Sequence, residues 1–97
     1  MKAYELMLMT DPSLDDEARE AVVSRASDVI KEAEGTVDEV DDWGKRRLAY
    51  EIDDLSDAHY TVVQFHASPD SVAELDRVLR ITDPVIRHMI VRREDLP

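Results

Sequence analysis

Residues 58–80, AHYTVVQFHASPDSVAELDRVLR, decide the fold because they place a predicted strand directly before a predicted helix. Alternation divides the strand at 58–67 into two faces, one with Thr61, Val63 and Phe65 and the other with Tyr60, Val62, Gln64 and His66. Ser68 supplies a hydroxyl cap, and Pro69 suits the first helical position. The helix then buries a stripe at helical spacing, made of Val72, Leu75, Val78 and Leu79. Asp83-Pro84 ends it.

The chain before this unit predicts a strand, a helix and a second strand. Residues 2–9 alternate as a strand with Tyr4, Leu6 and Leu8 on one face, and Asp11-Pro12 ends it. Either Ser13 or Asp15 caps the helix that follows. Its apolar spacing predicts about 18 to 20 residues, with Gly35 as the stop. Residues 37–52 form an extended region with a break at Trp43-Gly44.

The rest of the chain completes a regular order of elements. A polar turn is predicted over 53–57, a fourth strand over 85–93 and a tail over 94–97. The order β-α-β-β-α-β without a linker predicts a single domain over residues 1–97. Its class is α+β and ferredoxin-like, a four-stranded antiparallel sheet with two helices on one face. This fold supports many functions, so the function has to be argued from the surface.

The second face of the sheet should stay open, because no third helix is available to cover it. We expect that face to show apolar side chains beside an arginine, namely Met7, Val62, Gln64, Arg87, Met89 and Val91. An exposed apolar patch often marks an interaction site, so the pattern favours partner binding, with oligomerisation as the alternative. The sole tryptophan, Trp43, is an edge anchor, a contact residue or a side chain packed over the end of the sheet.

Charge is divided unevenly along the chain. Twelve Lys and Arg against twenty-three Asp and Glu leave a formal net charge of −11, which argues against generic binding of a polyanion. Residues 1–44 hold four basic and thirteen acidic side chains, whereas residues 45–97 hold eight and ten. The basic residues cluster at 45–47 and 77–93. Because binding responds to the field within about 10 Å at 0.1 M salt, a basic face remains possible, although each Arg alone is typical of a solvated surface.

Several kinds of chemistry are not expected from this sequence. The chain has no cysteine for a disulfide, a thiolate zinc site or a nucleophile, and its two glycines cannot form a phosphate loop. His59, His66 and His88 lack the spacing of metal ligands, and the serines lack the context of a nucleophile elbow. We therefore expect no enzyme, no cofactor, no metal and no small-molecule substrate. The longest uncharged stretch, 58–69, is too short and polar to cross a membrane, and without a leader the cytoplasm is expected.

Three segments together resemble a known family. They are Tyr4-Glu5-Leu6-Met7 followed by Asp11-Pro12, residues 43–52 (WGKRRLAYEI) and residues 79–89 (LRITDPVIRHM). Their order and spacing resemble the bacterial small-subunit ribosomal protein S-six family along nearly the whole chain. The resemblance implies the ferredoxin-like fold and a cytoplasmic, ribosomal location. It also implies binding to the central domain of small-subunit ribosomal RNA, paired with ribosomal protein S-eighteen, a small basic protein.

The resemblance also indicates which residues face the RNA or the partner. By position, Arg80 and Arg87 are candidates, and Arg46 and Arg47 lie in the most recognisable motif, although they could instead neutralise nearby aspartates. The full predicted RNA- or partner-binding set is Arg46, Arg47, Arg80, Arg87, Met89 and Arg92. The motif usually has Pro where this chain has Glu51, which restores a backbone donor and should cause only a local change.

A competing class is a dimerising ferredoxin-like module that senses a small molecule or regulates another protein. Such a module would form a homodimer through the open sheet. It gives no reason for the motif at 43–52, so the structural role in the ribosome is preferred.

Overall fold

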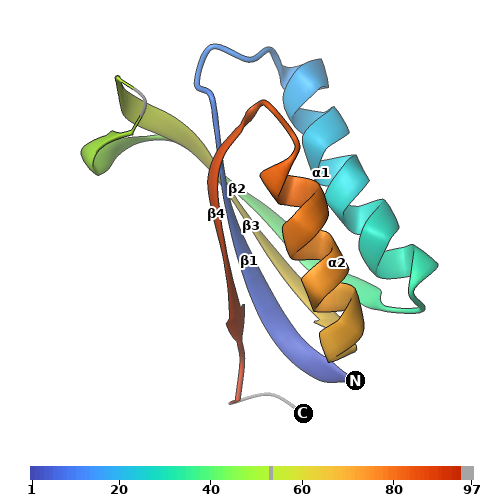
Figure 1. Ribbon diagram of the computed structural model, residues 1–97. Coiled ribbons are helices and arrows are strands. Elements are labelled where there is room, and N and C mark those ends of the chain that lie inside the picture. Colours follow the sequence, from blue (N-terminus) through green and yellow to red (C-terminus); the bar gives the residue numbers. More distant parts are fainter. Residues whose placement is uncertain (53, 95–97) are drawn as a thin grey trace.

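The computed structural model describes residues 1–52 and 54–94, which form strands and helices in the order β-α-β-β-α-β. The elements are β1 (Lys2–Thr10), α1 (Asp16–Glu32), β2 (Thr36–Ile52), β3 (Leu55–Ala67), α2 (Pro69–Arg80) and β4 (Val85–Arg92). The strands pair antiparallel in the order β2-β3-β1-β4, and both helices cover the same face of the sheet (Figure 1). The predicted α+β ferredoxin-like fold is confirmed.

Local hydrogen bonds explain where α1 begins and ends. Asp15 is the N-cap and accepts from the amide of Ala18 at 2.8 Å, while Ser13 bonds to Asp11 instead. The helix has 17 residues, slightly fewer than predicted. At its end the left-handed residue is Glu34, with φ 65°, and not the predicted Gly35. Gly35 is required for close approach, because a Cβ there would lie 2.6 Å from the backbone oxygen of His66.

The core lies between the helices and one face of the sheet. Its most buried large side chains are Phe65, Leu6, Leu8, Ile30, Leu75, Leu79 and Val63. Tyr4 and Phe65 stack with ring centroids 5.6 Å apart on neighbouring strands. The predicted inward face of β1 and the predicted apolar stripe of α2 are therefore confirmed, and neither helix covers the opposite face of the sheet (Figure 1).

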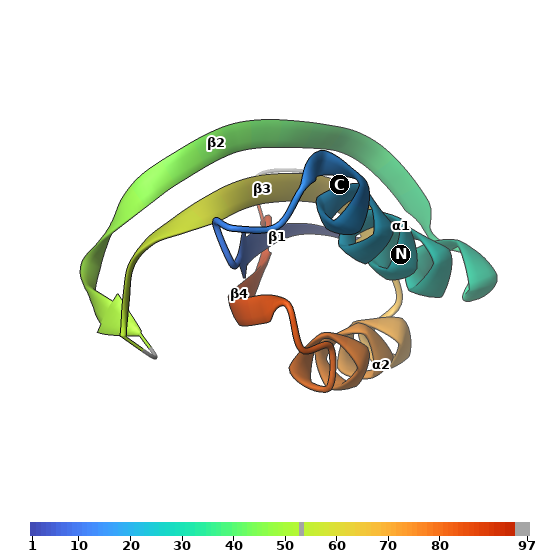
Figure 2. The same cartoon turned by 90° about the horizontal axis from the view of Figure 1, so that it is seen from above.

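The hairpin of β2 and β3 is longer than predicted. β3 begins at Leu55 and not at residue 58, so most of the expected polar turn belongs to the strand, while Asp53 lies outside the described residues. The break predicted at Trp43-Gly44 is a bulge inside a continuous β2, where the register shifts and Gly44 takes φ 78°. The end of this hairpin extends beyond the other strands and curves toward the uncovered side of the sheet (Figures 1 and 2). Of the predicted tail, only Glu94 is described.

Candidate interaction surface

The uncovered face of the sheet, called the open face below, carries the side chains that alternation predicted on β1 and β4. Met7 and Met89 are directly paired across these strands, and Arg87 pairs with Met9. His88 points to the other face, where its Nε2 lies 2.7 Å from Asp76 Oδ1 on α2. This arrangement agrees with the predicted alternation on β4, and it places Arg87 and Met89 beside each other on the open face.

An apolar hollow of about 170 Å³ lies between the open face and the curved hairpin. It is lined by Met7, Met9, Leu48, Ala49, Tyr50, Ile52, Tyr60, Arg87 and Met89. Leu48 anchors the hairpin, because it is 9% exposed and clusters with Met9 and Ala58. Arg87 Nη1 donates to the Tyr50 hydroxyl at 2.7 Å and closes one side of the hollow. The hollow can accept apolar side chains while a guanidinium and a hydroxyl stand at its edge.

A chain of polar contacts borders the hollow toward the other end of β4. Gln64 Nε2 donates to Glu5 Oε1 at 3.0 Å, and Arg93 Nη1 donates to Gln64 Oε1 at 2.9 Å. Val62 faces the same side, but it is only 2% exposed and does not add to the exposed apolar surface as expected. Arg93 was not predicted as a site residue. The alternation that places Arg87 and Met89 on the open face continues through Val91 to Arg93 and would have placed Arg93 on the same face.

Trp43 and Arg46 form a second contact on the hairpin. The Arg46 guanidinium lies 5.2 Å from the centroid of the Trp43 ring, which is within cation–π range. Trp43 Nε1 donates to Asp41 Oδ2 at 3.0 Å. Asp42 contacts the amide of Gly44 and the ring of His59. Within residues 1–52 and 54–94 neither Arg46 nor Arg47 forms an ion pair, so neither arginine is paired with Asp41 or Asp42.

The structure brings together three of the six predicted site residues. Arg46 pairs across the ladder with Ala58, which belongs to the cluster under the hairpin, so Arg46 shares the open face with Arg87 and Met89. Arg47, one residue further along β2, points to the opposite side. Arg92 pairs with Tyr4 of the core and therefore also points away from the open face.

Arg80 lies on α2, on the helix-covered side of the molecule. It bonds to Asp76, which also contacts His88. The hydrogen bond from Arg80, followed by that from His88, holds the pKa of Asp76 below its usual value. A surface shared by all six predicted residues does not exist, because α2 and the alternating strands separate them.

The open face carries apolar and basic side chains around the hollow. Within the described residues, no group of three or more His, Cys, Asp or Glu side chains could hold a metal ion. No helix in residues 1–52 and 54–94 has both the length and the apolar character needed to span a membrane. The open face of this ferredoxin-like domain carries apolar side chains, a tryptophan and three arginines, Arg46, Arg87 and Arg93, a combination that is typical of interaction surfaces.

Comparison with known proteins identifies the family. Residues 3–92 match the family model described as Ribosomal protein S6. Small ribosomal subunit protein bS6 of Clostridium perfringens (strain SM101 / Type A) is 49% identical over 94 residues, covering 97% of this chain and 99% of that protein. The bS6 protein of Clostridium botulinum (strain 657 / Type Ba4) is 50% identical, with coverages of 97% and 100%. The crystal structure of 30S ribosomal protein S6 from Thermotoga maritima matches with a TM-score of 0.90 at 35% identity, with coverages of 97% and 89%.

The chain belongs to the ribosomal protein S6 family of the small ribosomal subunit. Members of this family are structural proteins and not enzymes, and family membership places the chain on the ribosome in the cytoplasm. The resemblance read from the three sequence segments is therefore confirmed. The usual Pro position of the motif, Glu51, is exposed within β2, so the added charge stands in solvent.

Proposed function

We propose that the chain binds the central domain of small-subunit ribosomal RNA together with ribosomal protein S18 (S-eighteen) and so acts as a structural component of the ribonucleoprotein. The observation that supports joint binding of RNA and a protein most directly is the apolar hollow, which Arg87 lines and which shares the open face with Arg46. The hollow offers burial for apolar side chains of a protein, and the arginines offer charge to phosphate.

Charge supports the participation of a basic protein. At −11 the chain repels RNA at long range, whereas a basic partner is attracted and its encounter is accelerated. The complex of the two proteins then presents more positive charge to RNA than this chain does alone. Arg87 and Arg46 contact phosphate and 2′-hydroxyl groups and position the complex on folded RNA by shape, without reading its bases.

The proposed dependence of RNA binding on S18 is tested by measuring RNA affinity across a range of salt concentrations. The probe is an RNA fragment of the central domain, offered to the isolated chain, to S18 and to the two proteins mixed. We expect the mixture to bind more tightly than either protein alone, with a steeper loss of affinity as salt rises. If the isolated chain binds the RNA strongly and S18 does not change that affinity, the proposed dependence on S18 is wrong.

Arg87→Ala tests the proposed surface. Arg87 is exposed and makes one hydrogen bond with Tyr50, so the fold should remain intact. A lost hydrogen bond to a charged group costs about 1.5–3 kcal/mol, so we expect binding of RNA or of S18 to weaken by about 10- to 100-fold. Arg77→Ala is the matched control, because Arg77 is exposed on α2 and pairs with Glu74. Equal affinities for Arg87→Ala and the wild type would remove Arg87 from the site.

A further inference from the structure

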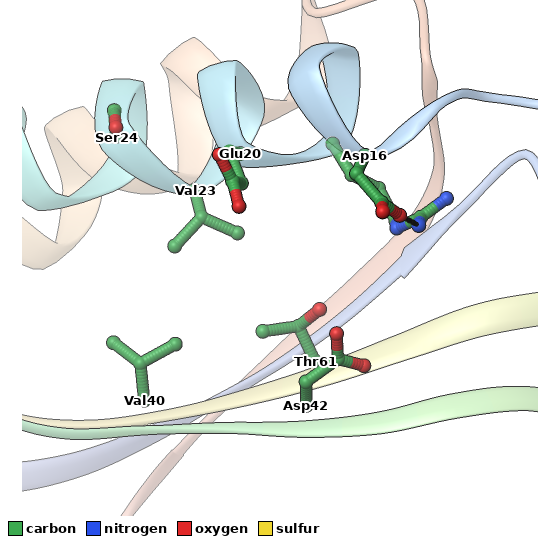
Figure 3. A pocket seen from close by; sticks show the side chains of 8 residues that line it. Asp16, Glu20, Val23, Ser24, Val40, Asp42 and Thr61 are labelled. Atoms are coloured by element: carbon green, nitrogen blue, oxygen red, sulfur yellow. Dashed lines mark hydrogen bonds and ion pairs between the residues drawn. The ribbon is translucent and has the colours of Figure 1, made fainter.

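A second groove, of about 510 Å³, lies on the helix side of the sheet between α1 and β2 (Figure 3). It is lined by Asp16, Arg19, Glu20, Val23, Ser24, Val40, Asp42 and Thr61. Val40 pairs with Val63 of the core, so the groove and the open face are on opposite sides of the sheet. β2 is an edge strand, so no further strand of the sheet lies beyond it on the outer side of the groove. The proposed RNA and S18 surface does not use it.

The middle of the groove is apolar. Val23 projects down from α1 toward Val40, which projects up from β2, and a gap separates the two side chains (Figure 3). Val40 is 47% exposed although it lies on the core side of the sheet, so part of its apolar surface is open to solvent in the groove. An aliphatic chain placed in this gap would contact both valines and remove apolar surface from water.

Carboxylates stand on both walls beside the valines. Glu20 points from α1 into the gap, and Asp42 rises from β2 next to Thr61 (Figure 3). Within the part of the chain that the structure describes, the Glu20 side chain makes no hydrogen bond or ion pair. The one cation of the groove, Arg19, is already bonded to Asp16 and to the backbone oxygen of Leu14. The groove therefore holds negative charge that its own arginine leaves uncompensated.

The charge of Asp42 is stabilised by its surroundings. Partial burial would raise the pKa of Asp42, but the hydrogen bonds from the Gly44 amide and His59, together with the charges of His59 and Arg19, outweigh burial and lower it. The Gly44 amide donates to Oδ1 at 2.8 Å, and His59 Nε2 lies 2.6 Å from the same oxygen. Asp42 is therefore ionised and fixed in position at neutral pH.

We propose that this groove docks a basic, extended segment of a partner protein, one of whose Arg or Lys side chains enters between α1 and β2. The aliphatic stem of that side chain packs between Val23 and Val40, as long basic side chains commonly do on apolar surfaces. Its cationic end pairs with Glu20 and Asp42, and charge-assisted hydrogen bonds of this kind are stronger than neutral ones. Charge complementarity excludes RNA and acidic segments from the same place. The inference goes beyond the proposed function and does not depend on it.

The test uses the isolated full chain and two synthetic probes. The ¹⁵N-labelled chain is titrated with the peptide Ac-Ser-Arg-Ser-Arg-Ser-NH₂ or with its Glu counterpart, and amide shifts are followed by NMR at low salt. We expect saturable shifts at Val23, Val40 and Thr61 with the basic peptide alone. Glu20→Lys should weaken this binding about fivefold or more, since it reverses one exposed charge. Val40→Ser should weaken it independently by removing one apolar wall.

Asp28→Lys is the matched control, with the same charge change on the exposed side of α1 but outside the groove. Its affinity for the basic peptide should equal that of the wild type. Equal weakening by Glu20→Lys and Asp28→Lys would overturn the proposal, because only the net charge would then matter. Equal binding of the Glu peptide, or shifts confined to the open face, would overturn it too. Spermidine binding with the affinity of the peptide would assign the groove to a free amine and not to a protein segment.

Discussion

Leu48→Ala should destabilise the chain and release the curved hairpin from the sheet. Leu48 is the buried side chain of β2 that joins Met9 and Ala58 beneath the hairpin, and it also lines the hollow of the open face. The substitution removes three carbon atoms from that contact. Most of the neighbouring side chains of β2 are exposed, so Leu48 is the main buried contact of this part of β2 with β1, with the partly buried Ile52 beside it.

The structure sets the size of the effect. Truncation of a fully buried Leu to Ala costs about 2–5 kcal/mol, of which part is the loss of apolar transfer and part is the cavity left behind. Leu48 is 9% exposed and borders a hollow of about 170 Å³, so the new space joins the hollow instead of forming an isolated cavity. The cavity part should therefore be small. We expect a loss of about 2–3 kcal/mol, which corresponds to about 10–20 °C in the midpoint of thermal unfolding.

Equilibrium unfolding in urea measures this loss. Trp43 is the sole tryptophan and lies on β2 five residues before Leu48, so its fluorescence reports on the hairpin, while circular dichroism reports on the helices. Tyr50→Ala is the control, because Tyr50 is 63% exposed and loses mainly its hydrogen bond with Arg87. Its loss should stay at or below about 1 kcal/mol. If Leu48→Ala costs no more than Tyr50→Ala, the anchoring role assigned to Leu48 is wrong.

Two further predictions concern stability. Gly35→Ala should lower the free energy of unfolding in urea by about 1–3 kcal/mol, because the added Cβ would lie 2.6 Å from a backbone oxygen. Gly44→Ala is the control, because its Cβ would meet no heavy atom within 4 Å and only backbone strain is expected. A loss for Gly35→Ala no larger than that for Gly44→Ala would contradict the close contact. Asp76, whose pKa is lowered by Arg80 and then His88, contributes stability above its ordinary pKa of 3.8, and that stability is lost as the pH falls through the lower folded pKa. Asp76→Asn should therefore flatten acid unfolding measured below about pH 4, and an unchanged profile would count against this linkage.

Most of the fold follows from short-range rules that operate within a few residues. The alternation of Tyr4, Leu6 and Leu8 predicts the buried face of β1, and Ser68-Pro69 predicts the start of α2. Both are confirmed because burial and capping act at the same positions that sequence periodicity identifies. The end of α1 was predicted less well, since the left-handed position fell on Glu34 and Gly35 was needed for space beside β3.

The site was harder to predict because one bulge changes which arginine faces the open side. Strict alternation from Asp41, which pairs with Val62 of the open face, would put Arg47 on that face. The extra residue at Trp43 shifts the alternation by one, so that Arg46 and Leu48 face it instead. Such a shift depends on how β2 pairs with β3, and single-sequence periodicity does not contain that information.

The two faces of the sheet separate charges that the sequence places close together. Arg46 lies on the open face, whereas Asp42, four residues earlier, stands with Glu20 in the groove under α1. A Debye length of about 10 Å at 0.1 M salt is comparable with the spacing of packed layers, so each face presents its own field to a molecule in contact. At longer distance a partner meets the net charge of −11, which attracts basic proteins and repels RNA. Under the proposed function the chain should therefore meet S18 before it meets RNA, and the arginines of the open face act only once the complex is in contact.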